Sequence, residues 1–147
     1  GHNYRISDIQ CALAISQMDK IDLFLEARKS MAKFYDQAFS EVPNIIPLQG
    51  HGRNNSSHHI YVVSIDFDKI GISRHQFMQK LAEQGIGSQG HYIPVVNQPY
   101  YQAMGYNIEQ LPSVNKYYQN TLSIPLYYGL TNSEQKNIVS SISFLLK

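Results

Sequence analysis

Apolar residues recur every three or four positions through the first part of the chain, which is the spacing of one face of an α-helix. One stripe runs through residues 9–16, and a longer one runs through residues 21–39. Because Asp19 can begin a second helix, the pattern predicts either two helices or one bent helix that ends before Pro43. A stripe of this kind is typical of a core or of an interface with a partner.

Three helix starts share one capping signal. A hydroxyl residue is followed three positions later by Gln or Glu, so that the two side chains satisfy each other's exposed backbone donors. The pairs are Ser7–Gln10, Ser73–Gln76 and Thr131–Glu134. Each pair precedes an apolar-periodic run, so the sequence also predicts helices over residues 73–84 and 131–145, with Gly85 as a C-terminal cap of the former.

Alternation of apolar and polar residues predicts the strands. The stretch IYVVSIDF predicts a half-buried strand with one face formed by Tyr61, Val63, Ile65 and Phe67. Residues 86–93 (IGSQGHYI) predict a second strand that is interrupted at Gly90, and residues 122–126 predict a short third strand. Residues 43–57 are rich in Pro, Gly, Asn and Ser and predict a loop, whereas residues 113–120 predict a short helix.

These elements predict one domain over residues 1–147. Its class is α/β of the α+β kind, with a small, mostly antiparallel sheet that is covered by helices and preceded by a long helical segment. A chain of 147 residues is long enough for its own core, and a composition of 43% hydrophobic and 16% charged residues is ordinary for a globular domain.

Charge and apolar content argue against two classes of partner. The net charge is +1 with neutral histidines, and Lys and Arg form no run, so a nucleic-acid partner has no electrostatic support. No apolar stretch approaches the ~20 residues that span a membrane, and no signal peptide is evident. The single cysteine, Cys11, lies in an apolar stretch and has no internal partner, so we expect a buried thiol and a cytoplasmic protein.

A metal site and a hydrolase site find little support. His58 and His59 are adjacent, so on a strand they face opposite sides and cannot readily share an ion. No Cys pair or His-x-x-x-His spacing accompanies them or the nearby His51, and we expect no metal. The chain has no Gly-x-Ser-x-Gly, and Cys11 lies in the wrong context for a nucleophile. GIGSQG follows a helix instead of opening one, so it is a weak match to a phosphate loop.

Two stretches remain as candidates for binding. GHNYR lies just ahead of a capped helix and offers the amide of Asn3 and the guanidinium of Arg5, to which backbone N–H groups add at the helix start. GHYIPVVNQPYY gathers His91, Tyr92 and Tyr100 on a stretch that prolines stiffen. Aromatic rings and a histidine suit a sugar or a base, which needs flat apolar faces and a few hydrogen bonds. A structural turn is the alternative for each stretch.

The order and spacing of these stretches resemble a known family. GHNYRISDIQCALAISQMDKID resembles the segment that follows the cofactor lysine in PLP-dependent nucleotide-sugar aminotransferases, which reads Gly-Tyr-Asn-Tyr-Arg and, a little later, Ile-Gln-Ala-Ala. Here His2, Cys11 and Met18 replace the usual Tyr, Ala and Leu. The similarity continues through essentially all 147 residues. HYIPV followed by QPYY is most similar to the branch that makes UDP-4-amino-4,6-dideoxy-N-acetyl-altrosamine for pseudaminic acid.

The resemblance implies a fold type I PLP-dependent transferase, of which this chain is the small C-terminal domain plus the helix that links it to a large domain. A lysine of the large domain holds PLP, and the active site is shared across a homodimer. The resemblance places Asn3 at the PLP phosphate of the opposite subunit, Arg5 near the same site, and His91, Tyr92 and Tyr100 toward the nucleotide sugar. It also implies transfer of an amino group, from glutamate, to the 4-keto group of a UDP-linked 4-keto-6-deoxy-sugar.

The chain departs from the family pattern in one respect, because it holds no large domain. Its lysines stand in no family-like Schiff-base context: Lys20, Lys29, Lys33, Lys69, Lys80, Lys116, Lys136 and Lys147. Since PLP chemistry needs such a lysine, we expect no catalytic residue in this chain and no activity from it alone. The competing hypothesis is a self-standing, non-catalytic domain that binds a sugar nucleotide or a protein partner.

Overall fold

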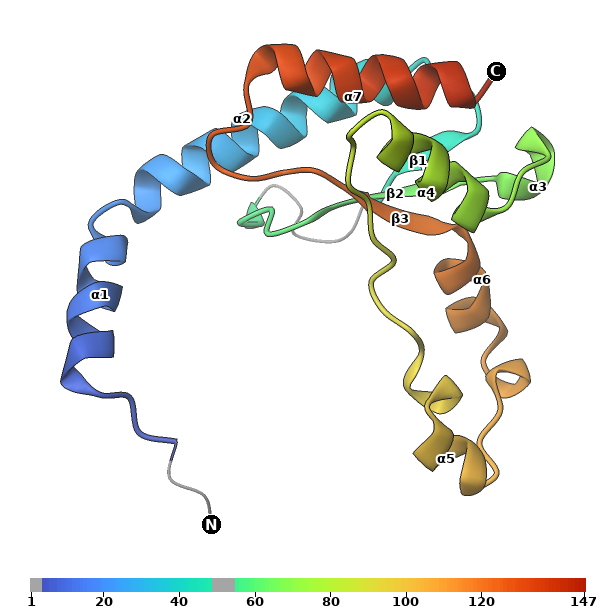
Figure 1. Ribbon diagram of the computed structural model, residues 1–147, viewed down its shortest axis with the longest axis horizontal. Coiled ribbons are helices and arrows are strands. Elements are labelled where there is room, and N and C mark those ends of the chain that lie inside the picture. The colour runs from blue at the N-terminus through green and yellow to red at the C-terminus, as the bar shows by residue number, and fades with distance from the viewer. Residues whose placement is uncertain (1–3, 49–54) are drawn as a thin grey trace.

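The computed structural model describes residues 4–48 and 55–147. Its centre is a three-stranded antiparallel sheet with the order β1 (Ile45–Pro47), β2 (Tyr61–Ile65) and β3 (Thr121–Ile124). Figure 1 shows this sheet under a layer of helices, with two extensions that leave the domain on the opposite side from that layer. The small antiparallel sheet covered by helices is therefore confirmed.

The central strand β2 owes its position to alternation along the sequence. Tyr61, Val63 and Ile65 are buried, while the residues between them are only half-buried. Val63 pairs with Pro47 of β1 on one side and with Leu122 of β3 on the other. The predicted strand is confirmed, although its fourth apolar residue, Phe67, already belongs to the short helix α3 (Phe67–Ile70).

Two predictions were wrong about where strands form. Residues 43–57 were predicted to be a loop, but they contain the edge strand β1. Residues 86–93 were predicted to be a strand, but only Gln89 pairs there, in a single bridge with Ser123. Glycine weakens a strand because it has no side chain to pack. Three glycines lie within residues 85–90, and the chain leaves the sheet directly after the last of them.

The two N-terminal stripes form separate helices, α1 (Asp8–Met18) and α2 (Ile21–Phe39), so the two-helix alternative is confirmed. The helices predicted farther along are α4 (Arg74–Glu83), α6 (Pro112–Asn120) and α7 (Asn132–Leu145). All three capping boxes form in both directions, before α1, α4 and α7. Gly85 adopts a φ of 74° after α4, a left-handed conformation that favours glycine in this terminal position.

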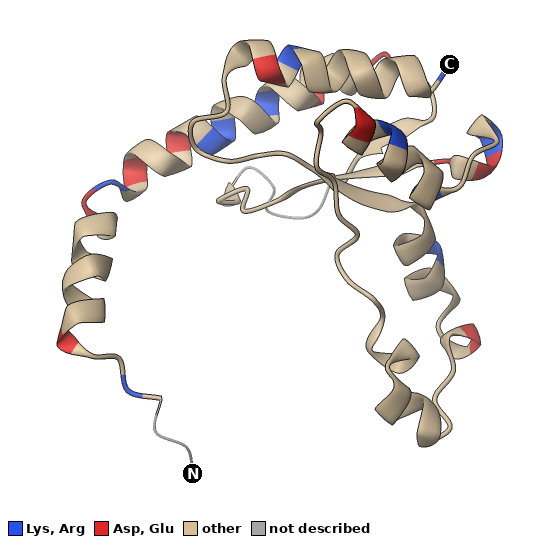
Figure 2. Cartoon of the chain, in the orientation of Figure 1, with Lys and Arg blue, Asp and Glu red and all other residues tan. Residues whose placement is uncertain are grey.

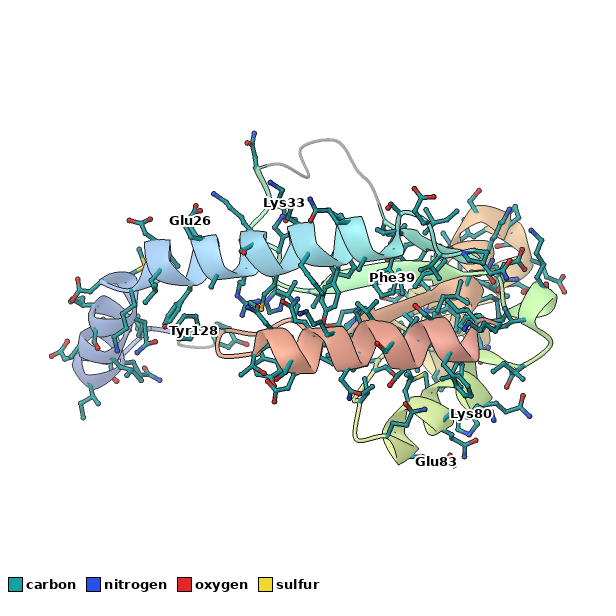
Figure 3. All side chains as sticks on the ribbon, turned by 90° about the horizontal axis from the view of Figure 1, so that it is seen from above. Glu26, Lys33, Phe39, Lys80, Glu83 and Tyr128 are labelled. Atoms are coloured by element: carbon teal, nitrogen blue, oxygen red, sulfur yellow. The ribbon has the colours of Figure 1, made fainter. Side chains whose placement is uncertain are left out.

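The core lies between the sheet and the helices α2, α4 and α7. In Figure 3, α2 and α7 lie side by side over the sheet, and the two helices are in contact. The largest fully buried side chains are Tyr35, Tyr61, Phe39, Phe77, Ile65, Leu81, Leu122, Ile142 and Val63. Each buried phenol has a partner. Tyr35 donates to the Pro125 carbonyl at 2.9 Å and Tyr61 donates to Asp36 Oδ1 at 2.7 Å.

Helix α1 is the first extension, and it projects away from the sheet (Figure 1). No residue of α1 is buried, and its apolar residues Ile9 and Leu13 are 84% and 64% exposed. The prediction that Cys11 is a buried thiol was wrong, because this side chain is partly exposed on a helix that no other described part of the chain buries. The apolar stripe of α1 is thus an unpartnered surface.

The second extension comprises residues 91–117, which we name the arm. It leaves the sheet after Gly90 and contains the short helices η2 (Val95–Asn97), α5 (Pro99–Ala103) and η3 (Ile108–Gln110). Its last residues, 112–117, belong to α6 (Pro112–Asn120), and the end of α6 leads back to β3. In Figure 1 it forms the yellow and orange hairpin that points away from the sheet, with α5 near its far end.

Candidate functional site

The arm combines many exposed tyrosines with very little charge. Glu109 and Lys116 are the only Asp, Glu, Lys or Arg residues in it, and Figure 2 shows its far end without charged residues apart from these. Exposed tyrosines occur along its whole length: Tyr92, Tyr100, Tyr101, Tyr106 and Tyr117. Tyrosine offers a flat apolar ring together with a hydroxyl, so this surface suits a ligand that has rings and hydroxyl groups.

His91 stands at the root of the arm in a defined orientation. Its Nδ1 lies 2.6 Å from Oγ of Ser123, a buried residue of β3. The backbone of Ser123 is itself fixed, because it exchanges two hydrogen bonds with Gln89, at 2.8 and 3.1 Å. The Ser123 hydroxyl therefore engages one ring nitrogen of His91 and leaves Nε2 for a ligand.

Tyr92 lies against His91. The two rings meet edge to face with their centroids 4.6 Å apart, and the Tyr92 side chain is 72% exposed. The structure therefore brings these two predicted residues together at one place. Tyr100 lies elsewhere, on α5, where its ring contacts Tyr101 at 5.3 Å, and Tyr101 contacts Tyr106 at 6.1 Å. The tyrosines of α5 form a separate aromatic group farther along the arm.

A hollow of about 330 Å³ opens beside His91. Its polar lining comes from Ser88, Gln89 and Ser123, and His59 and Ile60 close it on another side. Arg28 of α2 fixes that side, because its guanidinium donates to the carbonyls of His58 and His59 at 3.2 and 3.0 Å. Hydroxyl, amide and imidazole groups around a hollow of this size could hydrogen-bond the hydroxyl groups of a sugar.

Of the two predicted cofactor residues, the structure describes only Arg5, and it does not line this hollow. Arg5 is exposed just ahead of α1, and Figure 1 shows α1 and the arm as two separate extensions. Asn3 lies outside the described residues. Arg5 is on the segment before α1, whereas His91 and Tyr92 are at the root of the arm.

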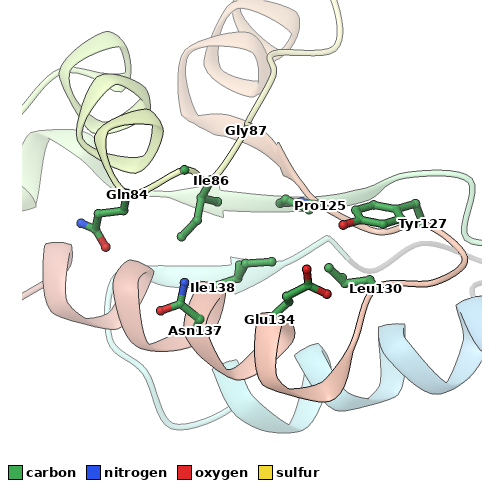
Figure 4. Close-up of a pocket in the computed structure, with 10 residues that line it drawn as sticks. Gln84, Ile86, Gly87, Pro125, Tyr127, Leu130, Glu134, Asn137 and Ile138 are labelled. Carbon is green, nitrogen blue, oxygen red and sulfur yellow. The ribbon is translucent and has the colours of Figure 1, made fainter.

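A second hollow, of about 420 Å³, was not predicted from the sequence. Figure 4 shows it between the end of α4, the segment after β3, and α7. Ile138 and Leu130 form apolar walls, and Glu134 lies at its edge. The Glu134 carboxylate has a structural explanation: it accepts hydrogen bonds from Thr131 at the start of α7, and these lower its pKa. Three segments that are distant in sequence form this hollow, so no local motif could reveal it.

Neither a metal cluster nor a buried amine is found in the described ranges 4–48 and 55–147. No three His, Cys, Asp or Glu side chains gather there to hold an ion. All eight lysines are exposed, and two of them, Lys29 and Lys69, form ion pairs with Glu26 and Asp66 on their own helices or helix caps. In the same part of the chain, no helix combines the length and the apolarity needed to cross a bilayer.

This fold and this arrangement of residues identify the class of protein. The chain belongs to the DegT/DnrJ/EryC1/StrS aminotransferase family, whose sequence profile matches residues 1–143. The spore coat polysaccharide biosynthesis protein SpsC of Bacillus subtilis is 30% identical, over 100% of this chain and 38% of SpsC. The UDP-4-amino-4,6-dideoxy-N-acetyl-beta-L-altrosamine transaminase of Campylobacter jejuni is 31% identical, over 100% of this chain and 39% of the transaminase.

Solved structures agree with the sequence comparison. PseC of Helicobacter pylori, an aminotransferase involved in the biosynthesis of pseudoaminic acid, superposes with a TM-score of 0.89 and 28% identity, over 99% of this chain and 39% of PseC. Spr1654 of Streptococcus pneumoniae, in a PLP form, superposes with a TM-score of 0.87 and 27% identity, over 97% of this chain and 36% of Spr1654. The chain therefore spans well under half the length of these relatives, and the predicted fold is confirmed.

Proposed function

We propose that this chain is the C-terminal part of a PLP-dependent sugar aminotransferase. The intact enzyme transfers an amino group from glutamate to the 4-keto group of a UDP-linked 4-keto-6-deoxy-sugar, in the biosynthesis of a surface glycan such as pseudaminic acid. Family membership supports the reaction class, and the similarity to two pseudaminic-acid-pathway enzymes supports the substrate class. We further propose that the enzyme is a cytoplasmic homodimer.

The observation that carries the proposal is the geometry of His91. A buried Ser123 hydroxyl orients its ring, the exposed ring of Tyr92 stands beside it, and His91 lines a hollow that also holds the polar groups of Ser88 and Gln89. In the proposed enzyme Nε2 of His91 hydrogen-bonds the nucleotide sugar, and the Tyr92 ring lies against an apolar face of it. Tyr100, on the outer part of the arm, contacts a more distant part of the same ligand.

The cofactor residues fit a phosphate by their chemistry. Arg5 offers a charged fork of donors just ahead of a capped helix start, where free backbone N–H groups also favour an anion. In the proposed enzyme Arg5 and Asn3 hold the phosphate of PLP in the partner subunit. When bound, PLP supplies the electron sink that allows nitrogen to move between amino acid and sugar. The lysine that anchors PLP lies outside this chain.

Two half-reactions test these roles separately in the two-domain protein, by which we mean this chain joined to the large domain that the proposal requires. Glutamate converts bound PLP to its amine form, which absorbs at a different wavelength, and the keto-sugar nucleotide reverses the change. We expect His91→Gln to slow the second half-reaction at low sugar concentration about tenfold, the loss expected for about one strong hydrogen bond, and to leave the first unchanged. His75→Gln, on the exposed face of α4, is the matched control. Equal effects on both half-reactions, or on neither, would overturn the assignment of His91 to the sugar.

A further inference from the structure

One arginine lies beside both ends of the arm. Arg74 is the first residue of α4, and its guanidinium donates to the Tyr118 carbonyl and, at 3.5 Å, to the Thr121 carbonyl. The same guanidinium stacks on the Tyr118 ring, with its central carbon 4.3 Å from the ring centroid. It also lies under Gly90, where an added Cβ would come 3.5 Å from a guanidinium nitrogen.

These contacts fall on the two roots of the arm. Gly90 is the residue directly before the arm, and Tyr118 follows directly after it. The Tyr118 carbonyl is also among the last four carbonyls of α6, which have no partner within the helix and favour a positive charge. Arg74 therefore stabilises the end of α6 and, at the same time, lies beside Gly90 at the outgoing root.

The chemistry of arginine suits this place better than that of lysine. A guanidinium has a planar face that stacks on a ring and several donors in a fixed fork, whereas an ammonium is a compact point charge. At Gly90, an added Cβ would lie within ordinary contact distance of the guanidinium, so Arg74 lies close to the residue that begins the outgoing root. The backbone bridge of Gln89 with Ser123 and the hydrogen bond of His91 to Ser123 also link the outgoing root to β3, but these contacts are made with β3 and not with α6.

We propose that Arg74 is a positioning residue for the arm: it fixes the direction in which the arm leaves the sheet, and thereby the place of His91 and Tyr92. The importance of this position for catalysis rests on the function proposed above, in which the arm contacts the sugar nucleotide. Arg74 itself touches neither ligand nor cofactor in this proposal, and acts only through the two roots.

Hydrogen–deuterium exchange of the 147-residue chain tests whether Arg74 fixes the arm. Peptides from the arm and from α6 are compared with peptides from β2 and α7 in the same sample. We expect Arg74→Gln to accelerate exchange in the arm about tenfold, the factor that the loss of one charge-assisted hydrogen bond represents, while β2 and α7 keep their rates. Arg74→Lys, which keeps the charge but loses the fork and the stacking, should give an intermediate rate and remain folded.

Lys80→Gln is the matched control, because it removes one positive charge from an exposed position on the same helix. Unchanged exchange in the arm would overturn the proposal, and so would equal acceleration in the arm and in α7, since that pattern means only general destabilisation. In the two-domain protein, Arg74→Gln should raise KM for the sugar nucleotide severalfold and leave the glutamate half-reaction unchanged. A loosened arm with an unchanged KM would overturn the positioning role. Failure of the proposed function would be seen in a different measurement, because the rate of the sugar half-reaction would then be unchanged in His91→Gln.

Discussion

Ser123→Ala removes the hydroxyl that orients His91 and changes almost nothing else. The hydrogen bond is 2.6 Å long and partly buried, and the backbone bonds of Ser123 to Gln89 do not depend on the side chain. A hydrogen bond of this type contributes about 1 kcal/mol to stability. Because His91 is partly exposed, water can hydrate the released nitrogen, so the loss should not exceed that figure.

For a chain of this size, about 1 kcal/mol corresponds to a fall in Tm of roughly 2–4 °C. The larger effect should be on the ring of His91, whose Nδ1 signal in ¹⁵N-edited spectra should shift toward that of a hydrated imidazole. In the two-domain protein, sugar binding should weaken about fivefold, the equivalent of about 1 kcal/mol. Ser140→Ala, which removes a hydroxyl from an exposed position on α7, away from this hollow, is the control. An unchanged His91 signal in Ser123→Ala would refute the orienting role.

Three further predictions concern stability and association. Burial raises the pKa of Tyr35 to about 12 from 10.0. The corresponding share of the free energy of unfolding, about 3 kcal/mol, is complete below pH 10 and is lost as the pH rises toward 12. In urea titrations, the free energy of unfolding of Tyr35→Phe should therefore fall less steeply with alkaline pH than that of the unchanged protein. Hydrogen bonds from Thr131 lower the pKa of Glu134 below 4.5, so this cap stabilises α7 above that pH and is lost as the pH falls through the lowered value. Thr131→Ala should therefore make stability, followed by circular dichroism, depend less steeply on pH in the acid range. An unchanged acid pH dependence in Thr131→Ala would contradict this. The uncovered stripe of α1 should make the chain self-associate in sedimentation, and Leu13→Glu should reduce this more than Phe144→Ser, a change at a similarly exposed residue of α7.

Local signals account for the parts of the fold that the sequence could predict. The capping boxes at Ser7, Ser73 and Thr131 marked helix starts because each is complete within four residues. Alternation located β2 for the same reason. β1 was missed because a three-residue edge strand that ends at Pro47 has the composition of a loop. The burial of Cys11 was mispredicted because an apolar stripe looks the same whether a core or an absent partner covers it.

The candidate site, too, could be predicted from the sequence only where local signals mark its residues. The stretch around His91 and Tyr92 could be recognised from its composition and from its resemblance to a family. Ser123, which orients His91, lies 32 residues farther along the chain, and the Tyr118 carbonyl lies 44 residues from Arg74. Ser123 and Arg74 belong to no motif, so only the three-dimensional arrangement reveals their contacts.

The central claim is that this chain serves a PLP site whose anchoring lysine lies in another domain. The direct test is to express the whole reading frame that contains these 147 residues, add PLP, reduce with borohydride and map the labelled lysine by mass spectrometry. We predict one stoichiometric adduct on a lysine outside this chain, and only scattered traces on the eight exposed lysines within it. A stoichiometric adduct on one of those eight, or a reading frame that encodes no further domain and retains no PLP, would contradict the account.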